Sequence, residues 1–174
     1  WKDSGFTNIA VSSLDNFYKN YHPDSSYWAG SKLDQKIYSN VTASQKANIA
    51  LAASHFHKEF NKTGKQESFE HARLWYERYL KHYKAYSQKD NIHYLYAELL
   101  QQNRKYPDAL HHYELAAYDA DIILNKDAAY ASILLATQLH RDTADKSARQ
   151  QYLDKLVKYS LLYTRLYPND KHAT

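Results

Sequence analysis

Apolar residues recur at spacings of three and four along most of the chain, which is the pattern of helices with one buried face. In one clear stretch Ile49, Ala53, Phe56 and Phe60 stand at this spacing. Short polar breaks separate such stretches, and the alternation of apolar and polar residues that is typical of a β-strand does not occur. The pattern therefore predicts an all-α chain.

Eight helices are expected between the polar breaks, and several have local signals at their ends. Asp24 or Ser25 suits the cap of the second helix, and Pro107 suits the first turn of the sixth. Thr42 and Gln45 form a capping box for the third helix. The linkers are short, so neighbouring helices should pair as antiparallel hairpins. The expected ranges are 7–20, 26–39, 43–61, 66–86, 91–103, 107–124, 127–140 and 146–167.

Parts of these hairpins repeat along the sequence. Residues 96–100 and 130–134 share the order Tyr, Ala, aliphatic, Leu at an offset of 34 positions. An aromatic–small–aromatic order in 69–76 returns in 106–113 at an offset of 37, and its last part returns in 148–152. A period in this range indicates stacked two-helix units.

The repeat resembles the tetratricopeptide repeat (TPR) family, whose unit is a helix–turn–helix of about 34 residues. The best-matching unit is 90–123. Five of its residues fit the small and aromatic positions of the family pattern: Ala97, Tyr106, Ala109, Tyr113 and Ala116. The resemblance implies antiparallel hairpins stacked as a short TPR-like superhelix, an α-solenoid.

On this resemblance the chain divides into an N-terminal hairpin and an array. Residues 1–40 are expected to form a helical hairpin that is a degenerate repeat or a cap. Residues 41–174 are expected to hold repeats at about 41–86, 90–123 and 124–168. The match is weaker outside the central unit, because the first helix of 41–86 is several residues too long and His140 stands where the turn aromatic belongs.

The resemblance also implies a partner-binding groove, because first helices line the concave face of such arrays. Asn and Gln side chains there could hydrogen-bond an extended peptide while Tyr packs on its side chains. The function expected is thus a non-enzymatic protein–protein interaction scaffold. The alternative is a helical regulatory or sensor domain that binds a small ligand and controls a separate effector domain. The positions that match the groove are Asn91, Tyr94, Glu98, Gln101, Gln102, Ser132 and Leu135.

Tyrosine-rich helix ends add a looser likeness. Segments 76–83 and 162–170 resemble those of bacterial cell-envelope TPR proteins, so the envelope or periplasm is the expected location. The chain has neither an initiator Met nor a signal-peptide core. We therefore expect it to be a processed piece of a longer protein, and the oligomeric state stays open.

Composition and charge exclude several classes of function. The net charge is +4, but Lys and Arg are interspersed with Asp and Glu instead of forming the basic stripe of a nucleic-acid binder, so no nucleic acid is expected as a partner. No apolar run reaches the length of about 18 residues that a membrane span needs. There is no Cys, and no common catalytic or cofactor motif occurs, so neither enzymatic activity nor a cofactor is expected.

The ten histidines are not expected to form a metal site. His55 and His57 stand about 200° apart around a helix and cannot chelate one ion. His111 and His112 are adjacent and also diverge. His82 has no ligand three or four residues away, and His71 has no second histidine at that spacing. Hydrogen-bonded or solvated histidines are the expectation.

Overall fold

The computed structural model describes residues 4–29, 34–83 and 91–172. Within these ranges, seven α-helices make up nearly all of the regular structure, together with one 3-10 turn and a pair of two-residue strands. The all-α class predicted from hydrophobic spacing is confirmed. The chain divides into two compact units, residues 1–84 (unit 1) and 85–174 (unit 2), each with helices and a core of its own.

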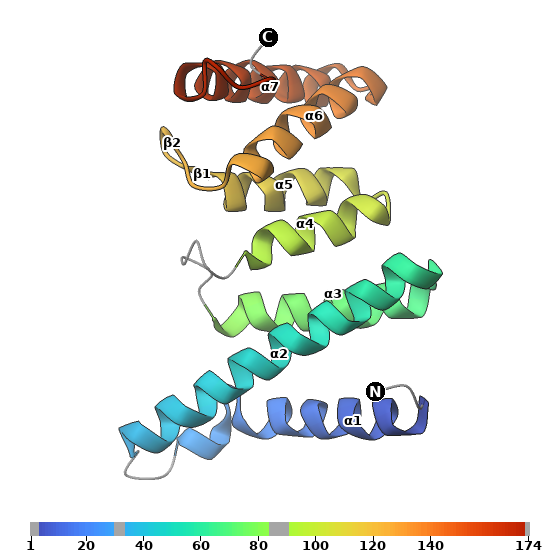
Figure 1. Cartoon of the computed structure of the whole chain (residues 1–174), viewed down its shortest axis with the longest axis vertical. Helices are drawn as coiled ribbons and strands as arrows, with labels where there is room; N and C mark the ends of the chain where they lie inside the picture. The colour runs from blue at the N-terminus through green and yellow to red at the C-terminus, as the bar shows by residue number, and fades with distance from the viewer. Residues whose placement is uncertain (1–3, 30–33, 84–90, 173–174) are drawn as a thin grey trace. The chain divides into compact units, whose positions relative to one another are not determined.

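Unit 1 contains three α-helices and the 3-10 turn (Figure 1). They are α1 (Ser4–Tyr21), η1 (Ser26–Trp28), α2 (Gln35–Thr63) and α3 (Gln66–His82). The cap of α2 is Asp34, whose carboxylate accepts hydrogen bonds from two backbone N–H groups of the first turn. This satisfies donors that the start of a helix would otherwise leave free.

The long helix α2 covers the end of the helix expected over 26–39 and all of the helix expected over 43–61, and residues 26–28 form η1 instead. The domain boundary expected between residues 40 and 41 therefore falls inside one continuous helix. Thr42 does not cap a helix, and its hydroxyl instead donates to the carbonyl of Tyr38 at 2.8 Å within α2. Polar residues at 39–44 thus lie on a helical surface and do not interrupt the helix.

Buried Gln45 connects the three helices of unit 1. Its Nε2 donates to the backbone oxygen of Phe17 on α1 at 3.0 Å. Its Oε1 accepts from the hydroxyl of Tyr83, directly after α3, at 2.8 Å. Because a buried amide without partners is costly, these contacts fix the position of α1 and the end of α3 on α2.

A glycine turn joins α2 to α3. Gly64 has φ 66° and its N–H donates to the oxygen of Phe60 at 2.7 Å, which is the usual left-handed end of a helix. The rings of Phe60 and Phe69 then meet across the hairpin at 5.6 Å. Trp75 and Tyr76 on α3 are fully buried in the same core.

Unit 2 contains four α-helices (Figure 1). They are α4 (Ile92–Gln102), α5 (Tyr106–Ala117), α6 (Lys126–Asp142) and α7 (Lys146–Leu166). Helix α5 packs on α4 and on α6, and α6 packs on α7. Ala97 and Ala109 are 0% exposed, and their small side chains allow the close approach of α4 and α5.

Helix α5 ends at Ala117 and not near residue 124 as the periodicity predicted. Two short antiparallel strands follow, β1 (Tyr118–Asp119) and β2 (Ile122–Ile123). Ala120 between them has φ 51°, and Leu124 donates its N–H to the carbonyl of Ala117 at 2.7 Å. Asp and Ile in this segment have low helix propensity, so the hairpin competes well with another helical turn.

Candidate functional site

The residues predicted on the first helix of the central repeat lie along one side of α4. Asn91 precedes the helix and Gln102 is its last residue, and both are exposed. Tyr94, Glu98 and Gln101 between them are half-buried. Spacings of three and four residues place these side chains on one helix face. We call these five residues the α4 surface.

Aromatic and polar contacts hold the middle of the α4 surface. The Tyr94 ring lies 5.8 Å from the ring of Tyr113 on α5, centroid to centroid. The Tyr113 hydroxyl donates to Oε1 of Gln101 at 2.7 Å. The amide oxygen of Gln101 thus accepts a hydrogen bond from the neighbouring helix.

Glu98 is the charged group of this surface. Burial raises the pKa of its carboxyl, and a hydrogen bond from Tyr94 opposes that rise. Burial, together with the Glu98 carboxylate, raises the pKa of Tyr94 to about 12. Glu98 is half-buried, so its carboxylate is partly shielded from water, and its attraction to a cation is stronger than in bulk solvent.

The beginning of α6 lies beside the beginning of α4. Asn125 Nδ2 donates to Asn91 Oδ1 at 2.9 Å, although the residues are 34 positions apart. Asn125 Oδ1 in turn accepts from the N–H of Ala128 and caps α6. The charge of Asp127 contributes to the raised pKa of Tyr94. Polar groups from two helices thus meet at one end of the α4 surface.

Two predicted partner-binding residues are not on a surface. Ser132 is 0% exposed and Leu135 is 1% exposed. The Ser132 hydroxyl donates to the carbonyl of Ala129 at 2.7 Å and contacts the hydroxyl of Tyr118 at 2.8 Å. Because α6 packs between α5 and α7, this face of α6 belongs to the core of unit 2, and both residues are removed from the candidate site.

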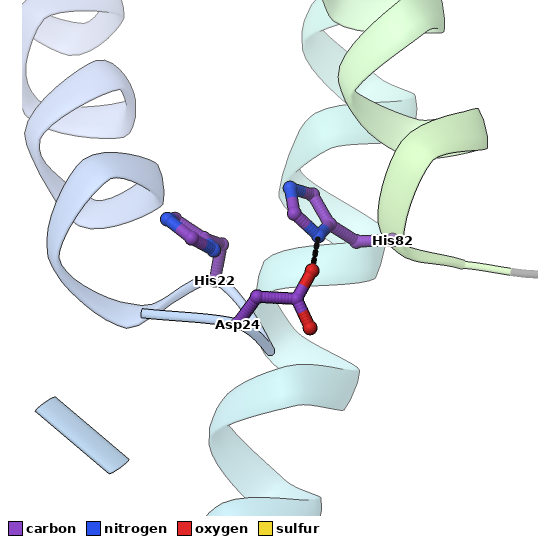
Figure 2. Close-up of side chains that lie close together, drawn as sticks. All are labelled: His22, Asp24 and His82. Carbon is purple, nitrogen blue, oxygen red and sulfur yellow. Dashed lines mark hydrogen bonds and ion pairs between the residues drawn. The ribbon is translucent and has the colours of Figure 1, made fainter. Parts of the chain in front are cut away.

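A cluster that the sequence did not predict lies in unit 1. His22, Asp24 and His82 approach one another at the point where the turn after α1 meets the end of α3 (Figure 2). His82 Nδ1 lies 3.0 Å from Asp24 Oδ2. The rings of His22 and His82 are stacked, with centroids 4.7 Å apart. From the sequence, metal ligands were considered only within one helical turn of each other. His82 and Asp24 are 58 positions apart, so this cluster was missed.

Tyr18 completes the surroundings of His82. Its hydroxyl lies 2.9 Å from His82 Nε2, and Arg78 stacks over its ring with the guanidinium carbon 4.4 Å from the centroid. Burial lowers the pKa of His82, and the hydrogen bond to Asp24 opposes that change. The His82 side chain is only 1% exposed, whereas that of Asp24 is 74% exposed. The cluster therefore opens to solvent on the Asp24 side.

A second histidine pair lies in unit 2. The Nδ1 atoms of His93 on α4 and His112 on α5 are 2.9 Å apart, so one ring must donate and the other accept. Burial lowers the pKa of His112 to about 4 and also lowers that of His93. Both rings are therefore neutral near pH 7.

Comparison with known proteins supplies no relative. No protein-family model, no curated protein and no solved structure matches the chain. Among the helices described in the three ranges above, none has both the length and the apolar character to span a bilayer.

Proposed function

We propose that unit 2 consists of two TPR-like hairpins, α4–α5 and α6–α7, and binds an extended segment of another protein along the α4 surface. The contact between Asn91 and Asn125 is the observation that carries this proposal. Its 34-residue separation equals the length of a TPR unit. The two asparagines hold equivalent positions, each directly before the first helix of its hairpin.

The chemistry of the α4 surface suits an extended peptide. Exposed amides on Asn91 and Gln102 offer donors and acceptors to a peptide backbone. Tyr94 offers a flat apolar face for a side chain of the partner. Because the Glu98 side chain is half-buried, we expect the bound segment to place a Lys or Arg beside its carboxylate.

The wider proposal is a scaffold that acts by binding and performs no chemistry of its own. Its support is the buried alanine seam between α4 and α5 and the repeat in the sequence. A short α-solenoid and a place in the bacterial cell envelope complete the proposal. The location in the cell envelope is proposed only from the resemblance of the tyrosine-rich helix ends.

Peptide selection on the full chain tests this proposal. Displayed random peptides are selected on the protein, and the dissociation constant of each is measured by fluorescence anisotropy. We expect selected peptides to contain a basic residue. Tyr94→Ala should weaken their binding by about tenfold or more, the equivalent of about 1.4 kcal/mol. Glu98→Gln should weaken it less, with a smaller dependence on salt.

Matched controls are available in unit 1. Tyr27 is 57% exposed, so Tyr27→Ala removes a tyrosine outside the α4 surface. The side chain of Glu67 is 83% exposed, so Glu67→Gln removes a carboxylate there. Both controls should bind like the wild-type chain. The proposal fails if the peptides bind Tyr94→Ala and Glu98→Gln as tightly as the wild type.

A further inference from the structure

We propose that His22, Asp24 and His82 form a site for a divalent ion of the zinc class in unit 1. Each residue offers one ligand atom, and the three atoms lie within 4.8 Å of one another. Imidazole nitrogen and carboxylate oxygen are ligands that Zn²⁺ accepts together. The proposal is independent of peptide binding, because the α4 surface lies in unit 2.

Two of the three ligand atoms already have the separation that an ion needs. Bonds of about 2.0–2.2 Å in a tetrahedral site place neighbouring ligand atoms roughly 3.3 Å apart. His82 Nδ1 and Asp24 Oδ2 are 3.0 Å apart. The third ligand atom, on His22, lies within 4.8 Å of both, and His22 directly follows α1 beside the turn that carries Asp24 (Figure 2).

One nitrogen of His22 has no partner among the residues that the structure describes. This atom, Nδ1, is buried and makes no hydrogen bond to them, an arrangement that buried polar atoms seldom show. The two imidazole rings are stacked at an interplanar angle of 27°, whereas an imidazole binds an ion in the plane of its ring. The His22 ring therefore turns off the face of His82 when the ion enters, and an unsatisfied nitrogen gains a ligand bond.

Tyr18 supports His82 from the opposite side of the ring. Its hydroxyl lies 2.9 Å from His82 Nε2. When Nδ1 binds the ion, the single proton of the neutral ring is on Nε2 and is donated to that hydroxyl. A hydrogen bond to the second nitrogen is the usual way in which proteins orient a histidine ligand.

The ion would join the turn after α1 to the end of α3. Entry is from the solvent, since the Asp24 side chain is 74% exposed. Three protein ligands leave a fourth position for water or for a side chain of another protein. The bound ion would therefore crosslink these two segments and stabilise unit 1.

Calorimetric titration of the untagged, chelator-treated full chain with ZnCl₂ tests the site. We expect one ion per chain with a dissociation constant in the micromolar range or below. Thermal unfolding is followed by tryptophan fluorescence, because Trp28 and Trp75 belong to unit 1. Saturating Zn²⁺ should raise the midpoint by at least about 3 °C. Mg²⁺ and Ca²⁺ should not, because they prefer sites made of oxygen ligands.

Variants connect the binding to these side chains. His22→Gln and Asp24→Asn should each weaken Zn²⁺ binding at least about tenfold and abolish the thermal shift. Asp24 is exposed, so Asp24→Asn should keep the circular dichroism of the wild type. His111→Gln, which changes an exposed histidine of unit 2, should bind Zn²⁺ normally. The proposal is overturned if no saturable binding occurs, if His22→Gln and Asp24→Asn bind like the wild type, or if His111→Gln removes the binding.

Discussion

Asn125 donates a hydrogen bond from Nδ2 to Oδ1 of Asn91 at 2.9 Å, and the two residues are 34 positions apart. Each stands directly before a helix, Asn91 before α4 and Asn125 before α6. Asn91 has φ 41°, a left-handed conformation that asparagine tolerates better than most residues. The contact therefore joins equivalent points of two successive hairpins.

Removing this contact should loosen the beginning of α6. Asn125→Ala loses both the link and the cap on Ala128, and we expect a cost of about 1–2 kcal/mol. Asn91→Ala loses the link alone and should cost less, about 0.5–1 kcal/mol. The loss of stability in each variant is measured by amide hydrogen exchange in the first turns of α4 and α6. In the double variant the two losses should be less than additive, and strict additivity would show that the link contributes nothing.

Leu135 should act as a core residue and not as a binding residue. It is 1% exposed, so Leu135→Ala should destabilise unit 2 by about 2–5 kcal/mol. Leu134→Ala is the matched control, since Leu134 is 52% exposed and should cost far less. Hydrogen exchange of α6 and α7 compares the two variants. Equal protection in Leu135→Ala and in the wild type would contradict the buried position.

Ser132 and Leu135 were predicted to bind a partner, but both are buried. A repeat pattern in the sequence does not by itself predict which positions are exposed. The 34-residue offset between segments 96–100 and 130–134 also separates Asn91 and Asn125, which both directly precede a helix. Such an offset does not determine how much of each helix is buried by neighbouring helices. Helix α6 has partners in both α5 and α7, so a face that carries polar residues on α4 is part of the core on α6.

Other features depended on contacts between distant segments. Apolar spacing was sufficient to predict the helical class, but it could not show that α2 continues through residues 40–43. Those residues are stabilised by the helix on either side and by the contacts of Gln45 with Phe17 and Tyr83. The His22–Asp24–His82 cluster was missed for the same reason, since its members come from the turn after α1 and from α3.

Acid should destabilise unit 2 through the His93–His112 pair. Burial lowers the pKa of His112 from 6.5 to about 4 in the folded chain, so the unfolded chain binds more protons between these values. The contribution of this neutral histidine to the free energy of unfolding should therefore be fully present above about pH 6.5 and should decrease as the pH falls toward 4. His93 changes in the same direction. Hydrogen exchange of α4 and α5, corrected for the intrinsic pH dependence of the exchange rate, measures this loss.

Substitution isolates the contribution of the pair. His112 faces His93 across the α4–α5 contact, the ring of Tyr96 lies 4.6 Å from it, and His111 is its neighbour along α5. His112→Gln cannot be protonated, so it should flatten the dependence of protection on pH over this interval. His111→Gln, at an exposed position, should leave most of that dependence in place. A steep acid loss that persists in His112→Gln would assign it to other groups.

Gly64 should be required for its backbone conformation alone. It has φ 66°, and a Cβ added there would meet nothing within 4 Å. Gly64→Ala should therefore cost about 1–2 kcal/mol, the strain of a left-handed alanine, without any steric clash. Gly64→Asn should cost less, because asparagine enters this region more readily. Urea unfolding followed by tryptophan fluorescence reports unit 1. If the two variants lose the same stability, the cost comes from something other than the preference of each residue for the left-handed conformation.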